Sequence, residues 1–111
     1  MNAAQATAAA PIYSTLANDR ELADLVELFV DELPRRVAFL RSLFAAGDRD
    51  ELERMAHQLK GAAGSYGFEA ITPAAARVEQ TVACGEPFAE IAEALEELIA
   101  LCEAARAGAP R

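Results

Sequence analysis

The sequence predicts an all-α fold, namely an antiparallel four-helix bundle with a flexible N-terminal tail. Alanine, leucine and glutamate dominate the composition, aromatic residues contribute only 6%, and the alternating apolar–polar runs typical of strands are absent. Four segments carry apolar residues at helical spacing, and the connections between them are short, which favours antiparallel neighbours. The chain has 111 residues, a length that fits one domain.

The N-terminal segment differs from the rest of the chain. Residues 1–11 are rich in alanine and lack a core pattern, so we expect a disordered tail. The remaining residues, 12–108, are expected to form the bundle. Because the sequence begins with methionine, we expect a free-standing protein, although a domain of a hybrid kinase remains an alternative.

The first helix is expected to begin after Asn18. This residue can cap the helix, and Glu21 can reach back from the third helical position. Proline removes a backbone hydrogen bond, yet the apolar spacing continues past Pro34 as far as Gly47. The pattern therefore predicts one long kinked helix or two nearly collinear helices.

Glycine and proline mark the remaining helix ends. The second helix is expected to begin near Asp48 and to stop at Gly67. For the third helix, Thr72 is expected to be the cap, followed by a proline in the first turn. That helix should end at Gly85, and Pro87 should open the last helix. The glutamates of the last helix are expected to form a solvated face.

Charge and cysteine content exclude several classes of function. The net charge of −8 argues against a nucleic acid or an anionic membrane as partner. We expect Cys84 and Cys102 to be buried, reduced thiols, and a single histidine cannot form a zinc site by itself. The chain shows neither a signal peptide nor an apolar run that could span a membrane, so we expect a cytoplasmic protein.

The only histidine, His57, is predicted to point away from the core. On a helical wheel, five apolar residues lie within about 40° of the side opposite His57. They form the predicted core face: Leu52, Met55, Leu59, Ala62 and Tyr66. An exposed imidazole is a neutral nucleophile near physiological pH, which suits a histidine that accepts a phosphoryl group from a docked protein.

Glycines accompany this histidine on the predicted exposed face. Gly61 and Gly64 lie within about 40° of His57 on the wheel, and Lys60 and Arg54 lie about 60° to either side. Each interior helical glycine costs on the order of 1 kcal/mol relative to alanine. A reason for bare backbone at this position is clearance for the surface of a partner, while the lysine could offset negative charge near the ring.

The segment HQLKGAAGSYG resembles the His-x-Leu-Lys-Gly-x-x-x-x-x-Gly signature of histidine-containing phosphotransfer (HPt) domains. The flanking sequence over 18–105 is also similar to this family, although less so than the motif. The resemblance implies a four-helix bundle that carries phosphoryl groups between aspartates of receiver domains in multistep phosphorelays. A related domain occurs at the N-terminus of chemotaxis kinases.

The resemblance also implies the roles of individual residues. His57 would be the phosphoacceptor, through Nε2, and Lys60 would support the phosphoryl group electrostatically. We expect the partner to contact Arg54, Gln58, Gly61 and Gly64. The partner would be a receiver domain of a response regulator or hybrid histidine kinase. It would hold the Mg²⁺, so no cofactor is expected in this chain.

Two alternatives to a phosphoryl carrier belong to other functional classes, a docking module and a kinase. A docking module could bind a receiver or kinase through the same face without being phosphorylated. A self-sufficient histidine kinase is disfavoured because the chain has no phosphate-cradling GxxxxGK[ST] loop. We therefore expect a monomeric phosphoryl carrier rather than an enzyme with its own nucleotide site.

Overall fold

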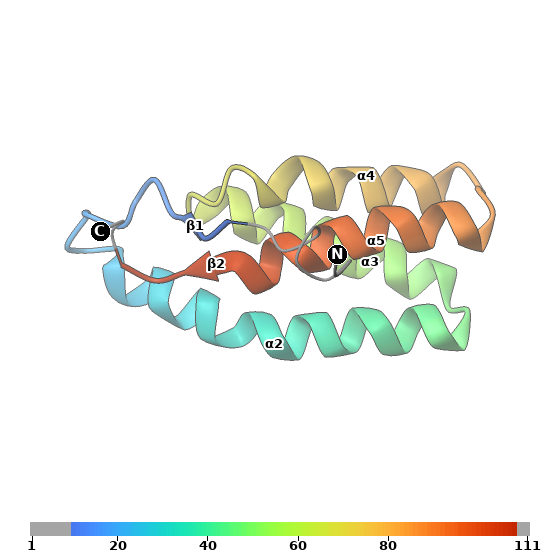
Figure 1. Cartoon of the computed structure of the whole chain (residues 1–111), viewed down its shortest axis with the longest axis horizontal. Helices are drawn as coiled ribbons and strands as arrows, with labels where there is room; N and C mark the ends of the chain where they lie inside the picture. The colour runs from blue at the N-terminus through green and yellow to red at the C-terminus, as the bar shows by residue number, and fades with distance from the viewer. Residues whose placement is uncertain (1–9, 109–111) are drawn as a thin grey trace, which may run out of the picture.

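The computed structural model describes residues 10–108, which form an all-α fold. Four helices lie side by side along the long axis of the molecule (Figure 1). They are α2 (Ala23–Ala46), α3 (Arg49–Ser65), α4 (Ile71–Ala83) and α5 (Phe88–Ala104). The predicted disordered tail falls mainly on residues 1–9, which lie outside the described residues.

The helix α2 begins later than the sequence pattern predicts. The prediction that Asn18 caps it is wrong, because the residue before the helix is Leu22, which makes no side-chain capping bond. Asp19 instead accepts a hydrogen bond from the Glu21 backbone N–H at 2.9 Å, within a turn that precedes the helix. Residues 14–22 are thus used in successive turns rather than in a first helical turn.

Beyond its start, α2 follows the prediction. It continues through Pro34 as a single helix. It ends at Gly47, which has a φ of 70° and donates its N–H to the carbonyl of Phe44 at 3.0 Å. A left-handed residue after the last turn is the usual way to end a helix, and glycine adopts this conformation without steric cost.

The predicted ends of the other helices are confirmed except at the start of α4. Thr72 is not the cap of α4, since Ala70 holds that position and makes no side-chain capping bond. Pro73 lies in the first turn, as predicted, where a missing N–H breaks no intrahelical bond. The helix ends before Gly85, and Pro87 directly precedes α5.

Two short strands accompany the helices. The sequence analysis did not predict them, because neither lies in a run of alternating apolar and polar residues. The strand β1 (Ile12–Tyr13) pairs in parallel with β2 (Ala105–Arg106), directly after α5. The residues that follow β1 hydrogen-bond to the chain just beyond α3. We call residues 12–16 the N-terminal strap, because they connect the ends of α3 and α5.

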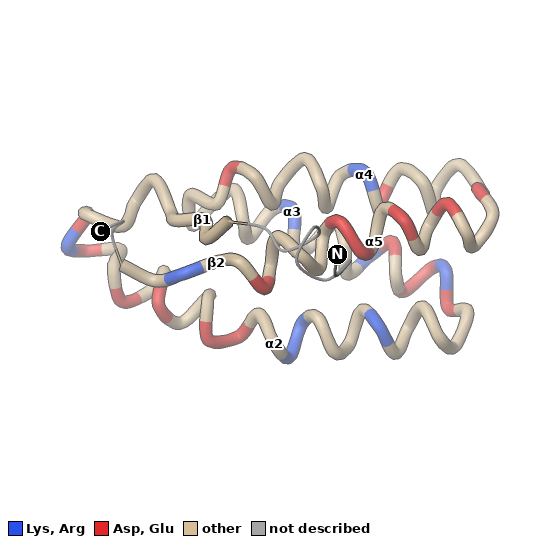
Figure 2. Tube along the Cα trace, in the orientation of Figure 1, with Lys and Arg blue, Asp and Glu red and all other residues tan. Residues whose placement is uncertain are grey.

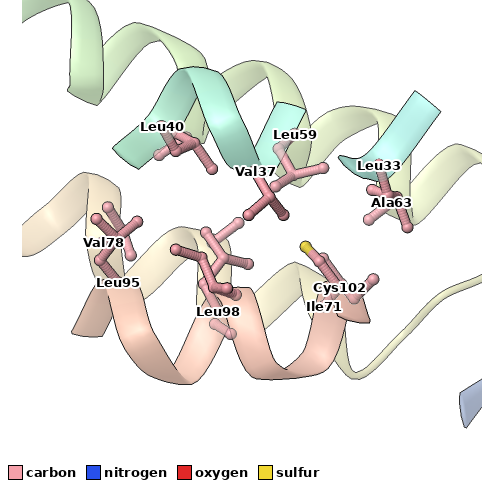
Figure 3. Packing of buried hydrophobic residues seen from close by; sticks show 14 of the residues in the cluster. Leu33, Val37, Leu40, Leu59, Ala63, Ile71, Val78, Leu95, Leu98 and Cys102 are labelled. Atoms are coloured by element: carbon pink, nitrogen blue, oxygen red, sulfur yellow. The ribbon is translucent and has the colours of Figure 1, made fainter. Parts of the chain in front are cut away.

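The core lies between the four helices, and each helix contributes apolar side chains to it (Figure 3). The residues labelled there are Leu33, Val37 and Leu40 of α2, Leu59 and Ala63 of α3, Ile71 and Val78 of α4, and Leu95, Leu98 and Cys102 of α5. At one end, the ring of Phe29 packs against Tyr66 and Phe68, with centroid distances of 5.3 and 5.7 Å. This aromatic cluster fixes α2 against the end of α3.

The cysteines are free thiols in different surroundings. Cys102 is buried in the core, and burial raises the pKa of its thiol to about 12. Cys84 is exposed, so the prediction that both are buried is wrong. Its position after the last turn of α4 explains this, because the chain there leaves the packed part of the bundle.

Acidic and basic side chains are separated along α2 (Figure 2). Acidic residues occupy its first half and arginines its second half. The helix α5 carries only acidic charges, and Glu90, Glu93, Glu96 and Glu97 are all exposed, as predicted. Within the described residues, no helix is both long and apolar enough to cross a membrane.

Candidate functional site

The imidazole of His57 projects from the middle of α3 into solvent. The helix starts after Asp48, whose side chain accepts a hydrogen bond from the Glu51 backbone N–H at 3.2 Å. The side chain of His57 is 64% exposed. The prediction that this imidazole faces solvent is confirmed, while its role as phosphoacceptor stays a prediction.

The core face of α3 is turned relative to the predicted one. Four of its residues are buried: Leu52, Ala56, Leu59 and Ala63. Of the predicted core positions, Met55, Ala62 and Tyr66 are only partly buried, although they pack against the core. The centre of the buried stripe is therefore about 50° away from the side opposite His57. The turn brings one flank of the histidine against α4.

The two flanks of His57 consequently have different neighbours. Lys60 and Gly64 face α4, and a Cβ atom built on Gly64 would lie 3.7 Å from Thr72 Oγ1, an ordinary contact. A Cβ atom built on Gly61, on the other flank, would have no neighbour within 4 Å. Packing within the described chain therefore requires glycine at neither position.

The flank of Gly61 also carries Arg54 and Gln58, the other two predicted partner contacts. Both residues are exposed. The guanidinium of Arg54 lies 3.5 Å from the carboxylate of Glu51, one turn earlier on the same helix. An exposed pair of this kind contributes little to stability, so Arg54 is available to another surface.

On the α4 flank, the carboxylate of Glu79 binds two residues of α3. One of its oxygens lies 2.8 Å from His57 Nδ1, and the other lies 2.8 Å from Lys60 Nζ. Hydrogen bonding from Lys60 is the largest cause that lowers the pKa of Glu79, and hydrogen bonding from His57 also lowers this pKa. The carboxylate is therefore ionised near neutral pH.

The ionisation of Glu79 determines how the hydrogen bond to the imidazole is directed. An ionised carboxylate has no proton and can only accept. Nδ1 of His57 is therefore the donor. Lys60, whose side chain is 33% exposed, is held by the same carboxylate beside the ring.

Glu79 is the residue that the sequence analysis missed. Its local sequence does not mark it as a site residue, because a glutamate on an amphipathic helix is ordinarily a solvated charge. The position of the predicted connection between the second and third helices could have identified Glu79. If two helices run antiparallel, positions at equal distances from the turn face each other, and His57 and Glu79 are equally far from Phe68.

Gly67, predicted only as the end of a helix, has a second role. Its φ is 80°, and a Cβ atom there would lie 2.6 Å from Ser14 Oγ and 3.0 Å from the Thr15 nitrogen. Its carbonyl accepts a hydrogen bond from the Thr15 N–H at 2.9 Å. The N-terminal strap can therefore approach α3 only because this residue has no side chain.

The exposed histidine of this helical bundle, with a lysine and two glycines beside it, fits the class of phosphocarrier modules. The family model described as Hpt domain matches residues 24–108, which is most of the chain. The chain belongs to this family, whose members are histidine phosphotransfer modules of phosphorelays and interact with receiver domains. No curated protein matches the chain, and no solved structure matches it.

Proposed function

We propose that this chain is an antiparallel four-helix bundle that carries a phosphoryl group on His57 between receiver domains. It would accept the group from the aspartyl phosphate of one receiver and pass it to an aspartate of another. The observation that carries the proposal is an exposed imidazole whose Nδ1 donates to Glu79, so that the neutral ring presents an unprotonated Nε2. In this proposal the protein acts in the cytoplasm as a monomer, and the receiver holds the Mg²⁺.

The transfer step needs no external proton. The lone pair of His57 Nε2 attacks the phosphorus of the aspartyl phosphate, and an N–P bond forms. The bond between phosphorus and the aspartate oxygen breaks, and its electron pair leaves with the carboxylate. Reversal of the same step on a second receiver returns Nε2 to its starting state.

Lys60 supports this step through its charge. A phosphoryl group on the ring brings nearly two negative charges to the surface of α3. Lys60 Nζ already lies beside the ring, since both bind the same carboxylate. A lysine is a point charge on a flexible stem and can follow the phosphoryl oxygens without reacting itself.

The receiver would approach from the flank of Gly61. On the other flank, Glu79 of α4 lies beside His57, and Thr72 of α4 lies beside Gly64. The flank of Gly61 carries bare backbone and the exposed side chains of Arg54 and Gln58. The open flank therefore gives a receiver the close access to His57 that in-line transfer requires.

A panel of purified receivers, each labelled on its aspartate, tests the function. The wild-type chain is expected to take label from at least one receiver, and His57→Gln is expected to take none. Ser42→Ala, which changes an exposed hydroxyl of α2 outside the site, is the control for general damage. Labelling of His57→Gln would refute the assignment of the acceptor. Receiver binding without any acid-labile phosphoprotein would instead favour the docking module, and labelling by ATP alone would favour a kinase.

A further inference from the structure

The exposed face of α2 carries five positions that are separated alternately by three and four residues. We call them the α2 stripe: Leu25, Leu28, Glu32, Arg35 and Phe39. Its three apolar side chains, in chain order, are 43%, 59% and 45% exposed. Residues at this spacing line up along one side of a helix, as they do at the seam between two packed helices. The α2 stripe is therefore a candidate contact surface.

The α2 stripe is turned away from α5. The helix α2 contacts both α3 and α5, and Arg41 marks the side of α5, because it binds Glu96 at 3.1 Å. On a helical wheel, the stripe is centred about 160° from Arg41 and about 110° from the buried side chains of α2. It therefore faces solvent on the side of α2 that adjoins α3.

The α2 stripe is complementary to a reversed copy of itself. Two copies of α2 can pack antiparallel, with a two-fold axis that passes between Glu32 and Arg35. Positions at equal distances from this axis then face each other. Leu28 lies against Phe39 of the second copy, and Glu32 lies against Arg35 of the second copy. A two-fold interface repeats every such pair, so each apolar contact and each ion pair occurs twice.

Charge favours the antiparallel orientation over the parallel one. Figure 2 shows acidic residues in the first half of α2 and arginines in the second half, so antiparallel copies place opposite charges together. Parallel copies would instead place Glu32 against Glu32 and Arg35 against Arg35, and like charges across an interface repel. Within residues 10–108, neither Glu32 nor Arg35 forms a salt bridge. Both charges are therefore available to a second copy.

We propose that the α2 stripe is the contact surface of a homodimer in which two copies of α2 pack antiparallel. The apolar pair of Leu28 and Phe39 supplies the area removed from water, and the pair of Glu32 and Arg35 sets the orientation. The stripe is about 21 Å long, so the interface is small. A reversible dimer is expected rather than an obligate one.

The dimer also regulates the proposed function, on which this part of the inference rests. Phe39 and His57 are equally far from Asp48, which connects α2 to α3, so the stripe lies level with the imidazole. The flank of Gly61 adjoins α2, because α4 occupies the opposite flank. A second copy therefore occupies the approach that a receiver needs. The dimer is the resting form, and the monomer transfers the phosphoryl group.

Sedimentation equilibrium of the full chain, without any receiver, tests the interface. The wild type is expected to dimerise reversibly between about 1 μM and about 1 mM. Glu32→Arg and Arg35→Glu should each raise the Kd of the dimer at least tenfold, because each brings like charges together. An equimolar mixture of the two variants is expected to form a heterodimer with about the wild-type Kd, because every charge then faces its opposite.

Glu27→Arg is the matched control. It makes the same change of charge at an exposed position of α2, outside the stripe, and is expected to leave the Kd unchanged. A wild-type chain that stays monomeric over the whole concentration range would overturn the inference. A mixture of Glu32→Arg and Arg35→Glu that associates no better than either variant alone would also overturn it. Because the mixture restores association, it shows in addition that both variants are folded.

Transfer rates distinguish a second copy on the stripe from a receiver on the stripe. If the dimer is the resting form, the rate per chain falls as the concentration of the wild type rises through the Kd, and Glu32→Arg removes this fall. A stripe that serves only the receiver would make Glu32→Arg slow at every concentration and leave sedimentation unchanged, which contradicts the inference. Dimerisation without any transfer would refute the proposed function and leave the interface standing.

Discussion

Glycines lie both within α3 and just beyond its end, and their surroundings differ. At the end, Gly67 has a positive φ, and its missing side chain makes room for Ser14 and Thr15 of the strap. Within the helix, a Cβ atom on Gly61 would meet nothing within 4 Å, and one on Gly64 would make an ordinary contact. Gly67 is required by the fold, whereas packing within the described residues requires glycine at neither Gly61 nor Gly64. A glycine-rich helix therefore needs to be interpreted position by position.

The largest effect on stability is expected at the end of α3. Gly67→Ala should lower the free energy of unfolding by about 2–3 kcal/mol, because a left-handed backbone is strained for alanine and the Cβ atom displaces the strap. Urea denaturation measures this loss. A loss below about 0.5 kcal/mol would mean that the strap moves away without cost, and that Gly67 is as dispensable for the fold as Gly61 and Gly64.

The hydrogen bonds of the strap should give the next largest effect. The buried hydroxyl of Ser14 donates to the carbonyl of Tyr66 and accepts from the Leu16 N–H at 2.9 Å. Ser14→Ala removes both bonds and should cost about 1–2 kcal/mol in urea denaturation. Ser42→Ala is the control, since that exposed hydroxyl donates only to Phe39 within its own helix. Equal effects of the two substitutions would contradict a structural role of the strap.

At Gly61, inside α3, the effect on stability should have the opposite sign. Gly61→Ala should raise the free energy of unfolding by about 1 kcal/mol, since alanine favours a helix and has open space there. Gly61→Leu should leave the helix content seen by circular dichroism intact and slow phosphoryl transfer. Ala89→Leu, an exposed position on α5, controls for a large apolar side chain on the surface. Transfer at the wild-type rate by Gly61→Leu would remove the clearance explanation.

The smallest effect should be the dependence of stability on pH. Lys60 and His57 hold the pKa of Glu79 below its ordinary value of 4.5. The carboxylate therefore stabilises the folded state above the pKa of the unfolded chain, and this contribution is lost as the pH falls through the lower folded value. The stability difference between the wild type and Glu79→Gln should shrink on acidification from neutral pH. No such trend is expected for Ser14→Ala, whose hydroxyl does not titrate.

Most of the fold could be predicted because its signals are local. Gly47, Gly67 and Gly85 each have a positive φ at the end of a helix, and local sequence encodes this requirement directly. The start of α2 could not be predicted in this way. The Asn18 pattern would suit a cap, but residues nearby are held in turns by contacts with the distant end of α3. A tertiary contact thus overrides the local preference.

In the candidate site, as in the fold, the features defined within one helix could be predicted and those that depend on contacts between helices could not. The exposure of His57 follows from the wheel, which concerns one helix alone. The turn of the core stripe toward α4 does not, because it depends on how neighbouring helices pack around α3. Glu79 lies outside the motif, and only the alignment of α3 with α4 brings it to the imidazole. Which residues of a site can be predicted therefore depends on whether one helix or two define them.

The pairing of β1 with β2 has a consequence for the order in which the chain folds. Ile12 pairs with Ala105, so this contact closes a loop that contains the four helices of the described chain. Closing a longer loop costs more entropy, and the pairing gains support only after the helices have packed. The strap should therefore form late and open first, and hydrogen exchange at the Thr15 amide should report its opening well below the free energy of global unfolding.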